Sequence, residues 1–558
     1  MSPLASRKER PWWRDAVTYQ IYPRSYADSN GDGIGDVEGI RSRLPYLKEL
    51  GIDAIWISPW YPSPQHDHGY DVSDYMDIEP DYGTLAQAEQ LIKEANDLGI
   101  KLIVDIVPNH TSSDHKWFQA ALKAGPGSPE RNRYMFRDGK GPNGDLPPNN
   151  WEAVFGGCAW ERVIEADGKA GQWYLHLFAV EQPDLNWENP EVVAHLEDVL
   201  KFWLDRGVAG FRIDVAHGMF KEKGLPDIRK DPAASMLGTE HKPFWDQEGV
   251  HDIYRAWRKI LDSYPGDRMA VAEAWVSPSE RIARYVRSDE LQNSFNFEML
   301  TTLWDAKQIK TKINNSIDAL KEVGAPTSWV FNNHDVVRSV DRLDLGLTNQ
   351  GDTTFLRQGD PKKLNIARGT LRARSAALMT LALPGGTYLY QGEELAVPEV
   401  RDIPEDRLTD PRWKMSGYSD RGRDGCRVPM PWTSNSAGAF GFSTNASLKP
   451  EQAWLPQSSW WGQYAVDTQD GVEGSTLSMY RKALAIRKGE EGLGDGPMEW
   501  IEAGKDVVAF ERPGDFACYI NFGAPIELPS NSQVLVSSGP ITGHTLPTDT
   551  AAWVRLVS

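Results

Sequence analysis

The chain has little cysteine. Only three of its 558 residues are cysteines, namely Cys158, Cys426 and Cys518. An odd number of widely spaced cysteines excludes a disulfide framework and is typical of a reducing compartment. The first residues also lack the apolar segment of a signal peptide. We therefore expect a cytoplasmic protein.

Positive charge and long hydrophobic runs are scarce as well. Lys and Arg total 60 against 79 Asp and Glu, which gives a formal net charge of −19 at pH 7. So acidic a chain is a poor partner for nucleic acid or an anionic membrane surface. The longest apolar runs, such as residues 376–383, are too short to span a bilayer. Nucleic acid and a membrane surface are therefore not expected as partners, and the oligomeric state stays open.

Strand-like runs alternate with segments of helical period along most of the chain. Segments with apolar residues at three-and-four spacing include 39–50, 85–98 and 192–204. The strand-like runs are 17–22, 54–58, 101–107, 210–215, 269–274, 291–297, 328–332 and 387–390. Alternation of this kind indicates a parallel α/β fold, and eight repeats predict a (β/α)₈ TIM barrel.

The alternation breaks in three places, which divides the predicted barrel. Residues 111–186 are rich in Pro, Gly, Asn and Trp, and they are too many for a loop without structure of its own. They predict a subdomain inserted after the third strand, so that the barrel comprises residues 1–110 and 187–488. A second polar insertion covers about 395–470. The short apolar runs of 489–558 predict a C-terminal domain resembling a β-sandwich.

Two acidic residues stand inside apolar strand-like runs. In Gly-Phe-Arg-Ile-Asp-Val at 210–215, Arg212 and Asp214 are two residues apart, so they project from the same face of a strand. In Ala-Val-Ala-Glu-Ala-Trp at 270–275, Glu273 interrupts a similar run. A pair of carboxylates is what glycoside cleavage requires. For either segment alone, a structural salt bridge is an equally good interpretation.

Residues 28–36 copy the first half of a calcium-binding loop. Oxygen-bearing side chains alternate at Asp28, Asn30 and Asp32, glycines permit a sharp turn, and Ile34 offers a backbone carbonyl. Position twelve of the loop is Gly39 instead of Glu, so this is not an EF-hand. The alternative is a turn that binds no metal.

Several short motifs then follow one another in a fixed order. They are Tyr-Gln-Ile-Tyr-Pro-Arg-Ser at 19–25, Asp-Ile-Val-Pro-Asn-His at 105–110, Gln-Pro-Asp-Leu-Asn-Trp at 182–187, Phe-Asn-Asn-His-Asp at 331–335 and Gly-Arg-Asp-Gly-Cys-Arg at 422–427. With the two acidic segments, these motifs make the chain similar to the α-amylase superfamily of glycoside hydrolases, specifically its α-glucosidase and oligo-1,6-glucosidase branch. The resemblance extends from about residue 12 to the C-terminal domain.

The resemblance implies a catalytic role for three carboxylates. Asp214 corresponds to the nucleophile, Glu273 to the general acid and base, and Asp335 to the residue that steadies the distorted sugar. A retaining mechanism needs the first two carboxyl groups about 5 to 5.5 Å apart. Arg212 is expected to favour ionised Asp214, and an apolar setting is expected to favour protonated Glu273.

The resemblance also implies a pocket for one terminal glucose. Tyr70 corresponds to the aromatic platform under the ring, and Asp67 with Arg427 corresponds to the pair that holds its far hydroxyls. Further contacts come from His110 and His334, which donate to hydroxyls, and from Phe155 and Phe178, which line the entrance or simply pack in the core. In this family the 28–36 loop is a structural Ca²⁺ or Mg²⁺ site closed by Asp36, with no organic cofactor.

The implied activity is that of an exo-acting retaining α-glucosidase. It releases glucose from the non-reducing end of maltose, isomaltose or short oligosaccharides by double displacement, with transfer to a second sugar as a further outcome. Val215 after the nucleophile favours α-1,6 bonds, but residues 216–218 depart from those relatives, so the linkage stays open. The main alternative is a glucosyl transferase or isomerase of the sucrose isomerase or trehalose synthase type. Non-catalytic transporter-associated heavy chains are a remote alternative, since all three acids are present.

Overall fold

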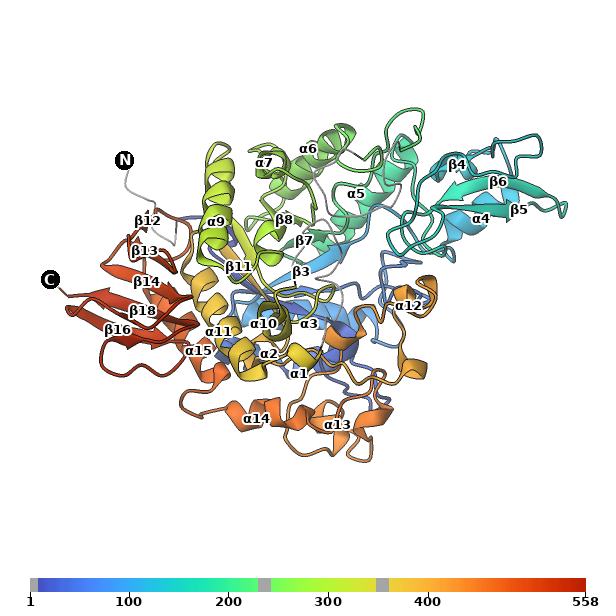
Figure 1. Cartoon of the computed structure of the whole chain (residues 1–558). Coiled ribbons are helices and arrows are strands. Elements are labelled where there is room, and N and C mark those ends of the chain that lie inside the picture. Colours follow the sequence, from blue (N-terminus) through green and yellow to red (C-terminus); the bar gives the residue numbers. More distant parts are fainter. Residues whose placement is uncertain (1–8, 229–241, 348–360, 558) are drawn as a thin grey trace.

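The computed structural model describes residues 9–228, 242–347 and 361–557. At its centre eight parallel strands form a nearly closed barrel in the order β10-β11-β1-β2-β3-β7-β8-β9 (Figure 1). They are β1 (Val17–Ile21), β2 (Ala54–Ile57), β3 (Lys101–Ile106), β7 (Gly210–Ile213), β8 (Met269–Ala272), β9 (Asn293–Ser294), β10 (Ser328–Val330) and β11 (Gly386–Tyr390). The N–H of Asn296, just after β9, donates to the carbonyl of Ser328 in β10 at 3.1 Å. The predicted TIM barrel is confirmed.

The barrel strands are buried on both faces. In β2, Ala54 and Trp56 pack with Val271 of β8 on one face, whereas Ile55 and Ile57 belong to the large core that the strands share with the helices. Alternate side chains of a strand point to opposite faces, so each strand contributes to two cores. This explains why the strands read as continuous apolar runs in the sequence.

Helices cover the outside of the barrel (Figure 1). They are α1 (Val37–Ser42), α2 (Leu44–Leu50), α3 (Leu85–Asp97), α5 (Pro190–Asp205), α6 (Gly249–Asp262), α7 (Ser279–Tyr285), α8 (Phe297–Leu300), α9 (Ala306–Lys321), α10 (Ser339–Leu345), α11 (Ile366–Ala382) and α15 (Thr476–Gly489). The single helix expected over 39–50 is two helices that meet at Arg43. Pro45 has no N–H to donate and its ring disfavours a continuous helix, so the chain restarts there.

A small subdomain projects from the barrel between β3 and β7 (Figure 1). It contains α4 (Lys116–Ala124) and an antiparallel sheet in the order β4-β6-β5, with β4 (Phe136–Arg137), β5 (Trp160–Ile164) and β6 (Ala170–Leu175). Its apolar core includes Phe155 and Phe178 and continues into Val215 and Trp245 of the barrel loops. The inserted subdomain therefore packs directly on the mouth of the barrel.

The chain after β11 forms two further parts. Residues 395–470 carry only short helices, among them α12 (Pro411–Met415), α13 (Gly438–Gly441) and α14 (Val466–Gln469). The C-terminal part holds a five-stranded antiparallel sheet, β12-β13-β14-β18-β16, and a two-stranded one, β15-β17. Their bounds are β12 (Glu499–Trp500), β13 (Val507–Arg512), β14 (Phe516–Asn521), β15 (Ile526–Glu527), β16 (Ser532–Ser537), β17 (Thr545–Leu546) and β18 (Thr550–Leu556). The indole of Trp553 in β18 donates to the carbonyl of Leu378, so this sheet docks on α11.

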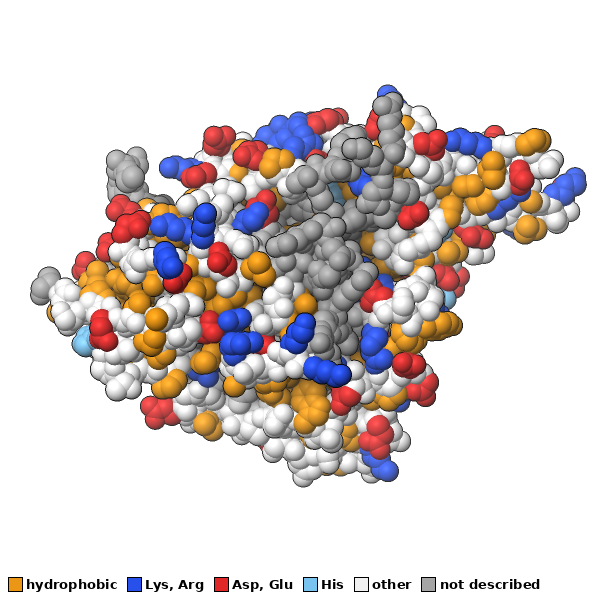
Figure 2. All heavy atoms as spheres, viewed as in Figure 1, with side chains coloured by type: hydrophobic (Ala, Val, Ile, Leu, Met, Phe, Trp, Pro, Cys, Tyr) orange, Lys and Arg blue, Asp and Glu red, His pale blue; other side chains and the backbone are white. Residues whose placement is uncertain are grey.

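The surface agrees with a small-molecule partner. On the face in Figure 2, basic and acidic side chains of the described residues are interspersed, although the chain as a whole is acidic. Within the described ranges, no helix is both long and apolar enough to cross a bilayer.

Candidate active site

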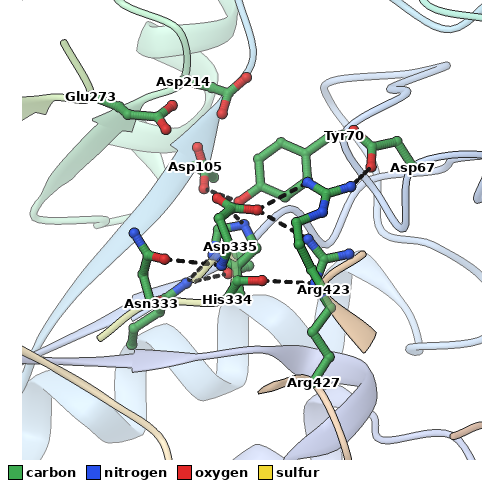
Figure 3. Close-up of polar contacts among 12 residues, drawn as sticks. Asp67, Tyr70, Asp105, Asp214, Glu273, Asn333, His334, Asp335, Arg423 and Arg427 are labelled. Atoms are coloured by element: carbon green, nitrogen blue, oxygen red, sulfur yellow. Dashed lines mark hydrogen bonds and ion pairs between the residues drawn. The ribbon is translucent and has the colours of Figure 1, made fainter. Parts of the chain in front are cut away.

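Arg212 holds three carboxylates together at the mouth of the barrel. Its β7 position is in register with Asp105 of the neighbouring β3. Arg212 Nη1 lies 3.0 Å from Asp105 Oδ1 and 2.5 Å from Asp214 Oδ1, and its Nη2 lies 2.8 Å from Glu273 Oε2. Figure 3 shows the carboxyl groups of Asp214, Glu273 and Asp105 gathered at one side of the site. The two acids predicted from separate strands thus converge on one guanidinium.

Both predicted catalytic acids stand directly after a strand. The ladder of β7 ends at Ile213 and that of β8 at Ala272, so Asp214 and Glu273 are the first residues beyond them. The carboxyl ends of barrel strands are where TIM-barrel enzymes place their chemistry. Val215 follows with φ of +43°, a left-handed conformation that is strained for a β-branched residue.

Burial dominates the ionisation of the nucleophile candidate. Asp214 and Asp105 are almost fully buried, and this burial raises the pKa of Asp214 well above its ordinary value and that of Asp105 to about 7. Arg212 lowers both values, as expected, but it does not outweigh burial. The reason is that one guanidinium serves three carboxylates, and each of the other two acids raises the pKa of Asp214 further.

The surroundings of Glu273 differ from the expected apolar setting. Its Oε2 accepts a hydrogen bond from the backbone N–H of Val215 at 3.0 Å besides the contact with Arg212. Its Oε1 accepts from the indole Nε1 of Trp275 at 3.1 Å. Polar donors therefore hold both oxygens of this buried carboxyl group. The expectation failed because the run 270–275 alone does not show that Arg212 and Val215, from the neighbouring β7 and its end, also reach Glu273.

The third carboxylate, Asp335, lies beside two arginines and His334. Its Oδ1 is 3.0 Å from Arg423 Nη1 and 3.0 Å from Arg427 Nη2, and its Oδ2 is 3.3 Å from His334 Nε2. Burial alone raises the pKa of Asp335, but His334 and the two arginines more than offset it and hold that pKa well below its usual range. Asp335 is therefore a fixed negative charge.

The carboxylate of Asp67 forms an ion pair with Arg423. Arg423 Nη2 lies 2.7 Å from Asp67 Oδ1, and the same guanidinium contacts Asp335 and, through Nε at 2.6 Å, Asp410. Arg427 instead donates to the backbone carbonyl of His334. The segment 422–427 has irregular backbone, so the motif alone does not show which arginine faces the pocket.

One pocket with about 620 Å³ of empty space joins these side chains. Its walls come from the barrel loops, the inserted subdomain and the 395–470 insertion, and consist of Asp67, Tyr70, His110, Val154, Phe155, Phe178, Asp214, Val215, Glu273, Trp275, His334, Asp335, Arg412 and Arg423. Of the expected site residues, Arg212 and Arg427 do not line the cavity but hold its acids. The remainder form its surface.

The expected sugar contacts form one connected group. The ring of Tyr70 stacks on His334 with centroids 5.1 Å apart, and its hydroxyl donates to Asp105 at 3.1 Å. His110 packs against Phe178 at 5.2 Å, and Phe178 meets Phe155 edge-on at 5.7 Å. Flat rings beside polar groups suit a sugar ring. The two phenylalanines thus line the pocket and belong to the subdomain core at the same time.

Five residues of the site were not predicted from the sequence, among them Val154 of the pocket wall. Asp105 had a usable signal, since it is an acid within an apolar run whose strand neighbours that of Arg212. Arg412 and Arg423 lie in the irregular insertion, where no periodicity guides an assignment. Trp275 follows Glu273 by two residues, so side-chain alternation along an extended segment would have placed both on one face.

The loop 28–36 has the oxygen atoms of a cation site. The carboxylate of Asp28 accepts backbone N–H groups of the loop at 2.6 and 2.8 Å, and Asp36 accepts the N–H of Ser29 at 2.8 Å. Burial raises the pKa of Asp32, and Asp28 and Asp36 raise it further. Over residues 9–228, 242–347 and 361–557, no group of three or more His, Cys, Asp or Glu is arranged to hold a metal. A cation here would thus depend on Asn30 and the carbonyl of Ile34 as well, an all-oxygen set that fits Ca²⁺ or Mg²⁺.

Two convergent acids beside a pocket at the mouth of a TIM barrel are the arrangement of a glycoside hydrolase site. The family model of the alpha amylase catalytic domain matches residues 20–496, and the chain belongs to this family. A probable alpha-glucosidase of Rhizobium meliloti (strain 1021) is 36% identical over 553 residues, 96% of this chain and 93% of that protein. An oligo-1,6-glucosidase of Parageobacillus thermoglucosidasius is 36% identical over 86% of this chain and 84% of its own. The solved structure of an alpha-glucosyl transfer enzyme, XgtA, is similar with a TM-score of 0.84 and 34% identity, covering 98% of this chain and 100% of that one.

Proposed function

We propose that the protein is an exo-acting retaining α-glucosidase that releases glucose from the non-reducing end of short α-glucosides. One observation carries the proposal: Asp214 and Glu273 bind the two Nη atoms of the same guanidinium, and both acids line one pocket. Such a pair can act on the two sides of one glycosidic bond. The relatives named as α-glucosidase and oligo-1,6-glucosidase support the same activity.

The proposed reaction has two displacement steps. First, a carboxylate oxygen of Asp214 bonds to the anomeric carbon while Glu273 gives its proton to the departing glycosidic oxygen. Then water attacks the same carbon, Glu273 takes a proton from that water, and the bond to Asp214 breaks. Two inversions leave the α configuration unchanged. Arg212 is the group that favours the ionised nucleophile against the effect of burial.

An ion-pair bridge supports the exo mode. Arg423 connects Asp67 with Asp335, and all three residues line the pocket. Gln182 donates to the second oxygen of Asp67 at 3.2 Å and so fixes this carboxylate. A pocket bridged in this way admits the end of a chain and not its middle.

Substitution of the nucleophile tests the proposal. Asp214→Asn removes the attacking charge at nearly constant volume, so turnover of p-nitrophenyl α-glucoside is expected to fall at least about a thousandfold. The exposed Asp289 provides a matched control, because Asp289→Asn changes an acid far from the pocket. Near-normal turnover of Asp214→Asn would remove this residue from the mechanism.

A glucosyl transferase or isomerase is the second candidate, and the similarity to the alpha-glucosyl transfer enzyme favours it. The charged segment 338–342 does not supply an acceptor site. Arg338 donates to the carbonyls of Gln391 and Cys426, Arg342 donates to backbone carbonyls, and both are buried. Chromatography of the products from maltose, isomaltose and sucrose decides between the two. Glucose supports hydrolysis, whereas isomaltulose or trehalose supports the alternative.

Three finer points belong to the proposal. Val215 lines the pocket and favours α-1,6 bonds, with mixed use of α-1,4 bonds. The loop with Asp28, Asn30, Asp32, Ile34 and Asp36 binds a structural Ca²⁺ or Mg²⁺, supported by its oxygen atoms and clustered charge. The cytoplasm is the proposed compartment, supported by the free state of all three cysteines.

A further inference from the structure

The two oxygens of Glu273 are held by donors of different kind. Oε2 meets the guanidinium of Arg212 at 2.8 Å and the backbone N–H of Val215 at 3.0 Å. Oε1 meets the neutral indole N–H of Trp275 at 3.1 Å. A proton on Oε2 would place a neutral hydroxyl where two donors already point, one of them cationic. The proton that Glu273 carries therefore resides on Oε1.

The indole of Trp275 is fixed in direction. Its ring stacks face to face on Phe297 with centroids 3.7 Å apart and an interplanar angle of 7°. Phe297 is buried at the start of α8. Trp275 also forms part of the pocket wall beside Glu273. The N–H therefore reaches the acid from a rigid support within the cavity.

The backbone on the other side of Glu273 is equally constrained. Val215 adopts φ of +43°, and in that conformation its N–H points at Glu273 Oε2. The N–H of Ala216 then donates to the backbone carbonyl of Glu273 at 2.9 Å. Strain at this position is the cost of fixing the acid relative to the nucleophile Asp214.

We propose that Trp275 is a positioning residue that selects Oε1 of Glu273 as the oxygen that transfers the proton. The inference rests on the proposed glycosidase function and adds a residue to it. Arg212 and Val215 hold Oε2 of the carboxyl group. The hydrogen bond from the indole of Trp275 holds Oε1 and so fixes the rotation of the group. When Oε1 carries the proton, its remaining lone pair still accepts the indole N–H, so the O–H points toward the departing oxygen. Proton transfer depends steeply on such alignment.

Leaving groups of different basicity provide the test. The p-nitrophenolate group of p-nitrophenyl α-glucoside departs with little help from an acid, whereas the sugar alkoxide of maltose needs a proton. Trp275→Phe keeps an aromatic ring against Phe297 and removes the N–H. We expect kcat/KM for maltose to fall about 10- to 100-fold more than kcat/KM for p-nitrophenyl α-glucoside, the range that one hydrogen bond to a charged group provides.

A matched substitution far from the pocket controls for the loss of an indole. Trp304 also donates its N–H to a carboxylate, that of Asp549 at 2.7 Å, and packs on Phe522. Trp304→Phe is expected to leave the ratio of the two kcat/KM values unchanged. Trp275→His retains a ring N–H, so it is expected to keep this ratio within about threefold of the wild-type value.

The outcomes separate the inference from the function on which it rests. Equal losses on both substrates in Trp275→Phe, or no loss, would overturn the positioning role while glucosidase activity stands. Should Trp275→Phe fail to fold, Trp275→His provides the test. A fall of about 10- to 100-fold in the ratio of kcat/KM for maltose to kcat/KM for p-nitrophenyl α-glucoside in Trp275→His would overturn the positioning role as well. Absence of activity on both substrates in the wild-type protein would instead refute the proposed function.

Discussion

At the scale of single residues, the pocket depends on the guanidinium of Arg423. This group contacts three carboxylates, Asp67, Asp335 and Asp410, and all three contacts are between 2.6 and 3.0 Å. A planar fork can bridge several acids at once, whereas the point charge of lysine cannot. Arg427, five residues from the start of the same motif, contacts only one of these carboxylates.

Arginine-to-lysine substitutions therefore show which of Arg423 and Arg427 contributes more to kcat/KM. Arg423→Lys is expected to lower kcat/KM for p-nitrophenyl α-glucoside by about 100-fold, because it loses charge-assisted hydrogen bonds to the pocket acids. Arg421→Lys, on the same loop but directed at the backbone of Ile403, is the control. A greater loss in Arg427→Lys than in Arg423→Lys would contradict this ranking.

The residue scale is also where the sequence was least informative. Asp214 and Glu273 could be found because each interrupts an apolar run of strand length. The choice between Arg423 and Arg427 could not be made, since 3-10 turns and loops have no period that assigns a side chain to a face. The raised pKa of Asp214 was missed for another reason: the sequence does not show how completely this residue is buried, nor that Glu273 and Asp105 share its arginine.

At the scale of elements, the sequence predicted the barrel strands but not the residues at which these strands end. Most barrel strands appear as apolar runs because both faces are buried, whereas β9 consists of Asn293 and Ser294. The runs overshoot, since β7 stops at Ile213 and β8 at Ala272 while the apolar character continues into buried loops. The segment 39–50 was predicted as one helix although the chain forms two, because the apolar spacing continues across the break at Pro45.

A buried acid links α10 to the 395–470 insertion and yields a pH prediction. Glu399 accepts the backbone N–H of Arg338 at 3.0 Å, and burial raises the pKa of Glu399 to about 8. In the unfolded chain this group titrates near 4.3. Its contribution to the free energy of unfolding is thus complete below about pH 4 and is lost as the pH rises toward 8.

Glu399→Gln removes this titration and keeps an acceptor for Arg338. We expect the fall in Tm between pH 5 and pH 9 to be smaller in the variant than in the wild-type protein, as followed by circular dichroism. Glu451→Gln, at an exposed position of the same insertion, should reproduce the wild-type curve. Parallel curves for Glu399→Gln and wild type would contradict the assignment.

At the scale of the whole molecule, the 28–36 loop joins the barrel to the second insertion. The backbone N–H of Asp28 donates to the carbonyl of Phe442 at 2.8 Å, and the N–H of Thr444 donates to the carbonyl of Asp28 at 3.0 Å. Asn445 reaches the carbonyl of Gly31 at 3.2 Å. A cation in this loop would therefore stabilise the contact between two distant parts of the chain.

Removal of the proposed cation should lower the stability of the whole protein. With Ca²⁺ at 100 times its Kd, binding adds about 2.7 kcal/mol to the free energy of unfolding. We expect EDTA to lower Tm and excess Ca²⁺ or Mg²⁺ to restore it, as measured by calorimetry. Asp32→Asn should abolish this response. If Tm changes with neither the chelator nor the added metal, the loop is a turn that binds no cation.

The shared guanidinium of Arg212 leaves the barrel mouth richer in acid than in base, with three carboxylates around one permanent cation. A sugar whose anomeric carbon becomes electron-poor as its bond breaks would bring the missing positive charge. The fold thus tolerates an electrostatic imbalance that the oxocarbenium-like transition state relieves. The same imbalance should make protonated nitrogen analogues of glucose bind more tightly than glucose itself.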